Sequence, residues 1–238
     1  AGAVEPASAA FLRFFIASVA MIIVTRAMEG KLPLPRPGLW LPLVLLGMTG
    51  VFAYNVFFFR GLHHISAGRA SLIVAATPLV ITLFAAVFLR ERLNTVKMCG
   101  VLLSLAGAIM VISNGHPGSL LVGGFGPGEL ALLGCVLSWS AYSLIGRSVL
   151  RSLPPLAAVC YSSIIGTIFL AFPAAREGLF FAGLPKISPL SWTSLFYLGL
   201  GGTALGFSLY YKGIKKIGAS RAGIFINLVP VFALLLSW

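Results

Sequence analysis

The sequence predicts an all-α integral membrane protein that is folded as an inverted-repeat helical bundle. Its 238 residues are 59% hydrophobic and only 9% charged, whereas a soluble domain carries about 25% charged residues. Apolar runs of about 20 residues recur along the chain, and a helix of that length crosses a hydrocarbon core about 30 Å thick. A short stretch that resembles a hinge also occurs twice, at 60–70 and at 212–222. The first two observations predict the membrane class, and the third predicts the repeat.

Eight membrane spans are visible in the pattern of apolar runs and breaks. The breaks are rich in proline and glycine: PLPRPG (33–38) cannot be helical, because proline lacks the backbone N–H and clashes with the preceding turn. NGHPG (114–118) and GGFGPG (123–128) are typical of turns, and SLPP (152–155) allows only a short connection. The spans are expected at 7–28, 38–60, 67–89, 95–113, 127–150, 154–175, 190–212 and 219–238.

Basic residues gather in the loops on one side of these spans. That side carries twelve of them: Arg26, Lys31, Arg36, Arg90, Arg92, Lys97, Arg147, Arg151, Lys212, Lys215, Lys216 and Arg221. The other side carries four: Arg60, Arg69, Arg176 and Lys186. Because cytoplasmic loops are enriched in Lys and Arg, the loops at 26–37, 90–97, 147–153 and 212–221 are predicted to be cytoplasmic. The net charge of +12 is therefore explained by basic loop residues that orient the protein in the membrane, and no nucleic-acid partner is expected.

The repeat pairs RGLHHISAGRA (60–70) with KGIKKIGASRA (212–222), an offset of 152 residues. At the same offset Trp40, Leu43, Leu46, Gly47, Gly50 and Pro78 return as Trp192, Leu195, Leu198, Gly199, Gly202 and Pro230. The second span thus matches the seventh and the third matches the eighth. Since matched spans differ by five in order, they cross the membrane in opposite directions. Inverted repeats of this kind are typical of secondary transporters.

The repeat also predicts how the chain is divided. Residues 1–113 form the first unit and residues 127–238 form the second. The fourth and fifth spans have no repeat partner, so each unit is expected to contain five helices in the complete protein. We expect a ten-helix (5+5) protein of which eight spans are visible, with the first helix of the first unit and the last helix of the second missing.

GLHHISAGRASLIVAATPLVITLFAAVFLRERL (61–93), followed by GVLLSLAGAIMVI (100–112), resembles the EamA family of the drug/metabolite transporter superfamily. GELALLGCVLSWSAYSLIGR (128–147) resembles the opening helix of the second unit of that family. The resemblance covers nearly the whole chain. It implies ten helices in two inverted units, export of small metabolites that are often amino acids, and residence in the inner membrane of a bacterium.

Enzyme and metal chemistry find little support in the residue types. The chain has no Asp, and its five carboxylates, Glu5, Glu29, Glu91, Glu129 and Glu177, all lie at or near predicted helix ends. The three cysteines fit no metal-binding spacing. We therefore expect no catalytic residue, no metal site and no cofactor.

Substrate contacts are sought among polar residues that occur in only one half, because positions that the fold needs tend to return in both. Gly47, Gly50, Pro78, Gly199, Gly202 and Pro230 return, and are predicted to serve packing or bending. The one-sided polar residues are Tyr54, Asn55, Thr77, Thr203 and Asn227. A stripe on one helix face adds Trp139 and Tyr142, for which lipid-facing or packing roles are equally open. Arg13, two turns into a span, faces either the interior or the near headgroups.

These features favour an alternating-access exporter of small metabolites, amino acids or other amphipathic or aromatic compounds, with a small molecule and the bilayer as partners. Two alternatives stay open. A nucleotide-sugar or organic-phosphate antiporter of the same superfamily would need several cations at midspan depth, where only Arg13 qualifies. An integral membrane enzyme is the other. We further predict that Asn55, Asn227, Trp139 and Tyr142 converge on one central cavity.

Overall fold

The computed structural model describes residues 4–91, 93–112, 116, 118, 126–183 and 187–228, and all regular structure among them is helical. The longer helices are α1 (Pro6–Glu29), α2 (Trp40–Leu46), α3 (Tyr54–His64), α4 (Ala67–Ala75), α5 (Thr77–Phe88), α6 (Thr95–Ile112), α7 (Pro127–Val149), α8 (Pro155–Arg176), α9 (Pro189–Tyr197), α10 (Gly206–Ile217) and α11 (Ala219–Ile224). Shorter helical turns are η1 (Pro37–Leu39), η2 (Gly47–Ala53), η4 (Leu179–Gly183), η6 (Leu198–Leu205) and η7 (Phe225–Leu228). The predicted all-α membrane class is confirmed.

Among the described residues, five helical stretches are long and apolar enough to cross a membrane: Pro6–Glu29, Pro37–His64, Gly68–Phe88, Pro127–Val149 and Pro155–Arg176. The predicted spans at 95–113 and 190–212 are helical where described but are not among the five. α6 runs from Thr95 to Ile112, and its sequence stays apolar to its end. The helix from Pro189 is rich in Gly, Ser and Thr. The span at 219–238 is described only as far as Leu228.

A π-helical turn interrupts a long helix at the same place in each half. The first is η2, from Gly47 to Ala53, between α2 and α3. The second is η6, from Leu198 to Leu205, between α9 and α10. With the repeat offset of 152 residues, η6 covers nearly the same repeat positions as η2. Such insertions are rare and frequently mark functional sites. The two copies thus share a backbone irregularity as well as a sequence pattern.

The helix that contains Pro78 is broken at Ala76, which separates α4 from α5. Proline has no N–H to donate to the carbonyl four residues earlier, which is that of Val74. The Thr77 hydroxyl donates to this carbonyl instead, at 2.5 Å. Thr77 therefore satisfies the backbone group that Pro78 leaves free. Pro230, the repeat partner of Pro78, lies outside the described residues.

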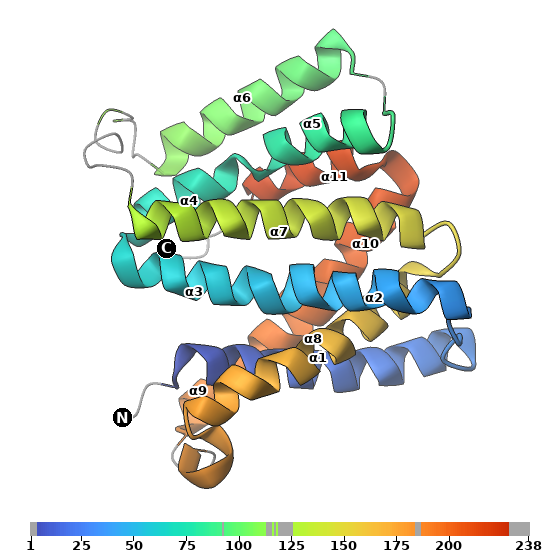
Figure 1. Ribbon diagram of the computed structural model, residues 1–238, viewed down its shortest axis with the longest axis vertical. Coiled ribbons are helices and arrows are strands. Elements are labelled where there is room, and N and C mark those ends of the chain that lie inside the picture. The colour runs from blue at the N-terminus through green and yellow to red at the C-terminus, as the bar shows by residue number, and fades with distance from the viewer. Residues whose placement is uncertain are drawn as a thin grey trace.

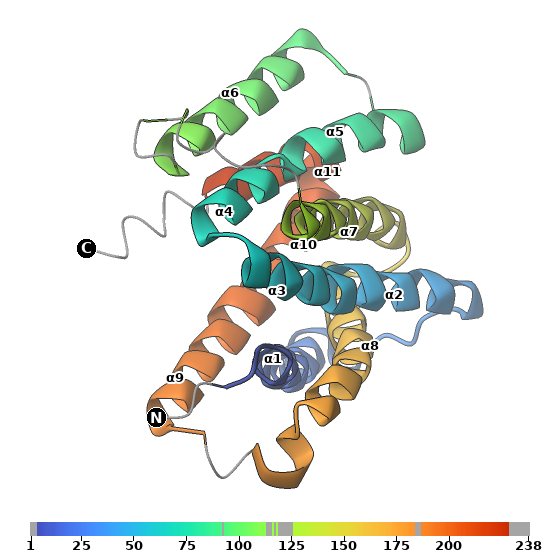
Figure 2. The same ribbon diagram turned by 60° about the vertical axis from the view of Figure 1, so that its left-hand side comes forward.

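The bundle is built around two long helix pairs (Figures 1 and 2). In the first pair, α1 packs along α8 and also contacts η6. In the second, α7 packs along α3 and reaches α4 and α5. On the far side of α7, the short helix α11 packs on α5. Helices of one half therefore pack mainly against helices of the other.

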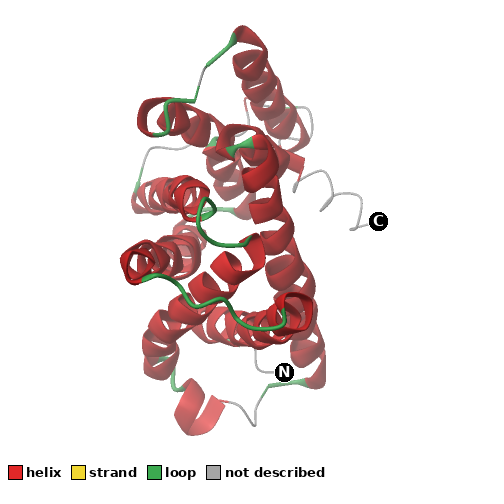
Figure 3. Ribbon diagram, turned by 90° about the vertical axis from the view of Figure 1, so that its right-hand side faces the viewer, coloured by secondary structure: helices red, strands yellow, loops and turns green. Residues whose placement is uncertain are grey.

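The two copies of the repeated stretch lie at opposite ends of the bundle. We call residues 61–68 the first hinge and residues 213–220 the second hinge. Figure 1 shows the first hinge at the left, where α3 meets α4 and where α7 begins. The second hinge lies at the right, with the turns that follow α1, α5 and α7, and Figure 3 views the bundle from this end. Opposite placement is what an inverted repeat requires.

Candidate functional site

A cavity of about 680 Å³ lies between α3, the α4–α5 break, α7, α10 and α11. Its size is within the range of pockets that hold small molecules. Helices of both halves contribute to it, and the break at Ala76 and the η6–α10 junction both open onto it. Its described lining is Tyr54, Val74, Thr77, Trp139, Gly202, Gly206, Phe207, Leu209, Tyr210, Gly213, Lys216, Ile217, Ala222, Phe225 and Ile226.

Aromatic side chains form one wall of the cavity, with Trp139 at their centre. The Trp139 ring lies 5.1 Å from that of Tyr54, 5.2 Å from that of Phe207 and 5.6 Å from that of Tyr210, between centroids. The contact with Phe207 is edge-to-face, an arrangement that aromatic rings prefer. These residues come from α3, α7 and α10, so the wall forms only when helices of both halves pack together.

A few polar groups are set into this apolar lining. The Trp139 N–H is buried and meets no acceptor in hydrogen-bond geometry among the described residues. The Tyr210 hydroxyl shares a hydrogen bond of 2.7 Å with the Ser143 hydroxyl. Lys216 is the one charged side chain in the described lining. An apolar cavity with a small number of placed polar groups is suited to an amphipathic ligand.

Three of the eight predicted substrate residues line the cavity: Tyr54, Thr77 and Trp139. Gly202, predicted to serve packing, lines it as well. Tyr142 lies one layer behind. Its ring is 5.4 Å from that of Trp139 and is fully buried, and its hydroxyl is 3.4 Å from the Ser162 hydroxyl.

Asn55 and Arg13 form a separate polar pair between α3 and α1. The Arg13 guanidinium donates to Asn55 Oδ1 at 3.0 Å, and Asn55 Nδ2 donates to the Val51 carbonyl at 2.6 Å. The guanidinium also lies 4.7 Å from the centre of the Phe14 ring. Arg13 therefore faces the bundle interior, one of the two possibilities that the sequence left open. This pair is not part of the described cavity lining.

Asn227 and Thr203 are also placed outside the described lining. Asn227 Nδ2 donates to the Ser104 hydroxyl of α6 at 3.1 Å, while its Oδ1 is buried without a partner among the described residues. Thr203 is buried within η6. Of the four residues predicted to converge on one cavity, Trp139 lines it and Tyr142 supports it, whereas Asn55 and Asn227 point to α1 and α6.

Three of the four repeated glycines, Gly47, Gly50 and Gly199, allow close helix packing. A Cβ at Gly50 would overlap the Tyr142 ring, and one at Gly47 would lie 2.8 Å from the Gly166 nitrogen of α8. A Cβ at Gly199 would lie 3.0 Å from the Arg13 carbonyl oxygen of α1. η2 and η6 therefore pack closely against the other half, as small residues at helix interfaces permit.

Sequence reasoning missed several residues of the cavity wall, chiefly Phe207, Tyr210, Lys216 and Phe225. A signal was present: Gly206, Tyr210, Gly213 and Ile217 follow one another at intervals of 4, 3 and 4, the same spacing that singled out Trp139 and Tyr142 on α7. All four line the cavity. Tyr210 is also one-sided, because its repeat partner is Phe58. Among the described residues, no group of three or more His, Cys, Asp or Glu is placed to hold a metal ion.

Comparison with known proteins gives the chain a family. The sequence profile of the EamA-like transporter family matches residues 1–113 and 126–238, which is nearly the whole chain. The chain belongs to the EamA-like transporter family. It is therefore an integral membrane transporter.

Named relatives of this EamA-like chain carry similar descriptions. The uncharacterized transporter YyaM of Bacillus subtilis is 27% identical over all of this chain and 77% of its own length. A probable terminal-alkyne amino-acid exporter of Streptantibioticus cattleyicolor is 30% identical over 95% of this chain and 73% of its own length. The aromatic amino acid exporter YddG of Ancylobacter novellus is 28% identical over 82% of this chain and 66% of its own length.

A solved crystal structure shares the fold. It is 29% identical in sequence, superposes with a TM-score of 0.78, and matches 99% of this EamA-like chain and 80% of its own chain. The helical arrangement described above is therefore one that an experimental structure also has.

Proposed function

We propose that this EamA-like transporter exports small amphipathic metabolites, foremost amino acids with aromatic or large apolar side chains. The observation that carries the proposal is the aromatic wall around Trp139, which is built from both halves of the repeat. Aromatic faces stack on a planar or apolar group, with about 0.5–1.5 kcal/mol for each aromatic pair beyond the area buried. Two relatives named as amino acid exporters support this substrate class.

Transport proceeds by alternating access, in which the two halves move about a site near the bilayer midplane. In this proposal the end of the bundle with the second hinge faces the cytoplasm of a bacterial cell and the end with the first hinge faces outward. The loop charges support this orientation. Single cysteines at Ser66 and Lys215, labelled with an impermeant thiol reagent on intact cells, should react at Ser66 alone.

Lys216 places a positive charge in the cavity lining. It lies on the same end of α10 as Lys212 and Lys215, but it alone of the three lines the cavity. An ammonium group at the edge of an aromatic cavity favours a ligand with a carboxylate. A single cation is less than the organic-phosphate alternative requires, since a phosphate ester carries up to two negative charges.

Efflux from preloaded proteoliposomes tests the proposal. Trp139→Phe keeps an aromatic ring but removes the N–H and part of the stacking surface, so efflux of an aromatic amino acid should fall about tenfold, as a loss of about 1.4 kcal/mol implies. Trp40→Phe is the matched control, because Trp40 is half-exposed beside Tyr161 and away from the cavity. Lys216→Gln should slow the amino acid but not its amide, which lacks the carboxylate, with Lys215→Gln as control. Wild-type protein that moves no amino acid would refute the proposed substrate class.

A further inference from the structure

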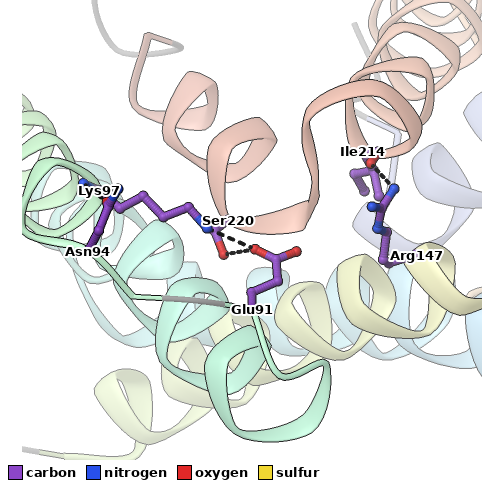
Figure 4. Close-up of polar contacts among 6 residues, drawn as sticks. All are labelled: Glu91, Asn94, Lys97, Arg147, Ile214 and Ser220. Atoms are coloured by element: carbon purple, nitrogen blue, oxygen red, sulfur yellow. Dashed lines mark hydrogen bonds and ion pairs between the residues drawn. The ribbon is translucent and has the colours of Figure 1, made fainter.

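The second hinge is held by a carboxylate that comes from the other half of the molecule. Glu91, in the turn between α5 and α6, accepts a hydrogen bond of 2.7 Å from the Ser220 hydroxyl at the start of α11 (Figure 4). Lys97, on α6, lies 3.5 Å from the same carboxylate oxygen. The Glu91 side chain is 18% exposed, so it has exchanged most of its water for these partners. Hydrogen bonds to an ionised group are stronger than neutral ones.

The turn that carries Glu91 is fixed by its backbone. Arg90 adopts a left-handed conformation, with φ of 53°, and the Glu91 N–H donates to the Ala85 carbonyl at 3.1 Å. This is the pattern that ends a helix with a sharp reversal, usually at glycine. On the other side Asn94 accepts from the Lys97 N–H at 2.9 Å, which caps α6. The position of the carboxylate is therefore set by the ends of two helices.

The second hinge is shaped to receive this carboxylate. Gly218 has φ of 89° and ψ of 165°, a combination that is almost confined to glycine. A Cβ at Gly218 would lie 3.0 Å from Glu91 Oε1. The absence of a side chain there lets the carboxylate approach the backbone of the hinge, and Ser220, two residues on, supplies the donor.

The contact lies at the end of a seam between the two halves. α11 packs on α5, and a Cβ at Gly223 would lie 3.2 Å from Ile81 Cδ1. Residues of the second hinge and of α11 also line the cavity, among them Gly213, Lys216 and Ala222. Separating α11 from the end of α5 would open the cavity toward this end of the bundle.

The other polar anchor of the second hinge does not cross the halves. Arg147, at the end of α7, donates to the Ile214 carbonyl at 2.9 Å (Figure 4). It also donates to the Lys215 carbonyl at 3.0 Å. Arg147 belongs to the second half by sequence, as the hinge does. That anchor can persist when the halves separate, whereas the bond between Glu91 and Ser220 must break.

We propose that Glu91 and Ser220 form the latch of a gate at the end of the bundle that holds the second hinge. Glu91 is a positioning residue: it touches no substrate but holds the hinge against the end of α5. When the gate opens, water replaces the Ser220 hydroxyl at the carboxylate, and Lys97 stays beside it because both belong to the first half. The proposal rests on the alternating access proposed above, but not on the identity of the substrate.

Accessibility of a cavity residue tests the latch without any substrate. A cysteine at Val74, which lines the cavity, is introduced with the exposed Cys99 changed to Ser. Labelling with an impermeant thiol reagent is compared in inside-out and right-side-out vesicles. Ser220→Ala and Glu91→Gln should each raise the labelling rate in inside-out vesicles about tenfold, which corresponds to about 1.4 kcal/mol and is near the lower limit for a hydrogen bond to a charged group. The double variant should label no faster than the faster single variant, because both changes act on the same contact: Ser220→Ala removes the donor and Glu91→Gln replaces the charged acceptor with a weaker neutral one.

Two matched variants serve as controls. Ser66→Ala removes the hydroxyl of the first hinge, whose described hydrogen bond is to the nearby Arg69 N–H of the same half. Glu29→Gln removes a carboxylate for which no ion pair is described. Neither variant should change labelling. Ser220→Ala removes a single hydroxyl and carries the test even if Glu91→Gln does not fold. Labelling of both latch variants at the parental rate, or an equal rise in right-side-out vesicles, would overturn the proposal. If the latch variants are labelled faster but the protein exports no amino acid, only the proposed substrate class is refuted.

Discussion

The two hinges share a sequence pattern but are anchored in different ways. The first hinge is embedded: a Cβ at Gly61 would lie 2.5 Å from Leu132 Cγ of α7, and the nearby Arg69 pairs with Glu129 of α7 at 2.9 Å. At the second hinge a Cβ at Gly213, the repeat partner of Gly61, would find only the Ala222 Cβ within 4 Å, at 3.7 Å. Equivalent positions are therefore tightly packed at one end and open at the other.

The two hinges also differ in the hydrogen bond that their serine makes. Ser66 begins α4 in an ordinary extended conformation, with φ of −63°, and its own hydroxyl accepts from the Arg69 N–H. Its repeat partner Gly218 has no side chain, and the Ser220 hydroxyl two residues on donates to the Glu91 carboxylate in the other half. The start of α4 is thus capped by its own serine, whereas the serine at the start of α11 bonds to the other half. From this difference in packing and bonding we expect the second hinge to move and the first to stay with α7.

The largest effect is expected at Gly218. In Gly218→Ala the new Cβ is strained by the positive φ and lies 3.0 Å from Glu91 Oε1, so the variant should lose about 3 kcal/mol of stability. Ser66→Ala, at the corresponding position, should lose at most about 0.5 kcal/mol, because its cap bond is long and exposed. The melting temperatures of the two variants in detergent make the comparison. Equal losses would mean that the hinges are not anchored differently.

A second pair of variants compares packing at the two hinges. Gly61→Ala should cost about 2 kcal/mol, because a Cβ there meets Leu132 and overpacking is destabilising. Gly213→Ala, inside α10, has room and should be neutral or stabilise by about 0.5 kcal/mol through helix propensity. Thermal melting again reports both, and a loss at Gly213 as large as that at Gly61 would refute the difference in packing.

The smallest effect is expected at Arg90, which lies outside the hinge but sets the direction of Glu91. Arg90→Gly relieves the left-handed strain and should raise stability by about 1 kcal/mol or less. Arg151→Gly, in the turn after α7, removes the same exposed side chain without such strain to relieve and should give no gain. A stabilised Arg151→Gly would show that loss of positive charge, and not strain, is responsible.

The sequence predicted the fold well because hydrophobic length and proline-rich breaks decide where membrane helices begin and end. It also predicted the opposite placement of the hinges, since an odd separation between matched spans leaves no other geometry. It did not predict the π-helical turns that begin at Gly47 and Leu198, because hydrophobic length and proline breaks do not distinguish a π-helical from an α-helical turn.

The candidate site was predicted in part. One-sided polarity selected Tyr54 and Thr77, and helix spacing selected Trp139; all three line the described cavity, and their contact with a substrate stays a prediction. The same rule selected Asn55 and Asn227, whose amides contact Arg13 and Ser104. Polarity shows that a buried residue needs a partner, but it cannot show whether that partner is a ligand or another helix. The sequence placed Glu91 near a helix end but did not reveal its partner, because Ser220 lies 129 positions away in the chain.

One measurement tests the central claim most directly, that the second hinge moves while the first stays fixed. Paired spin labels at Leu93 and Lys215 span the second hinge, and labels at His63 and Leu130 span the first; all four side chains are exposed. Distances are measured by pulsed electron resonance in the parent and in Glu91→Gln. The account predicts a longer distance across the second hinge in the variant and an unchanged distance across the first. A change across the first hinge with none across the second would contradict it.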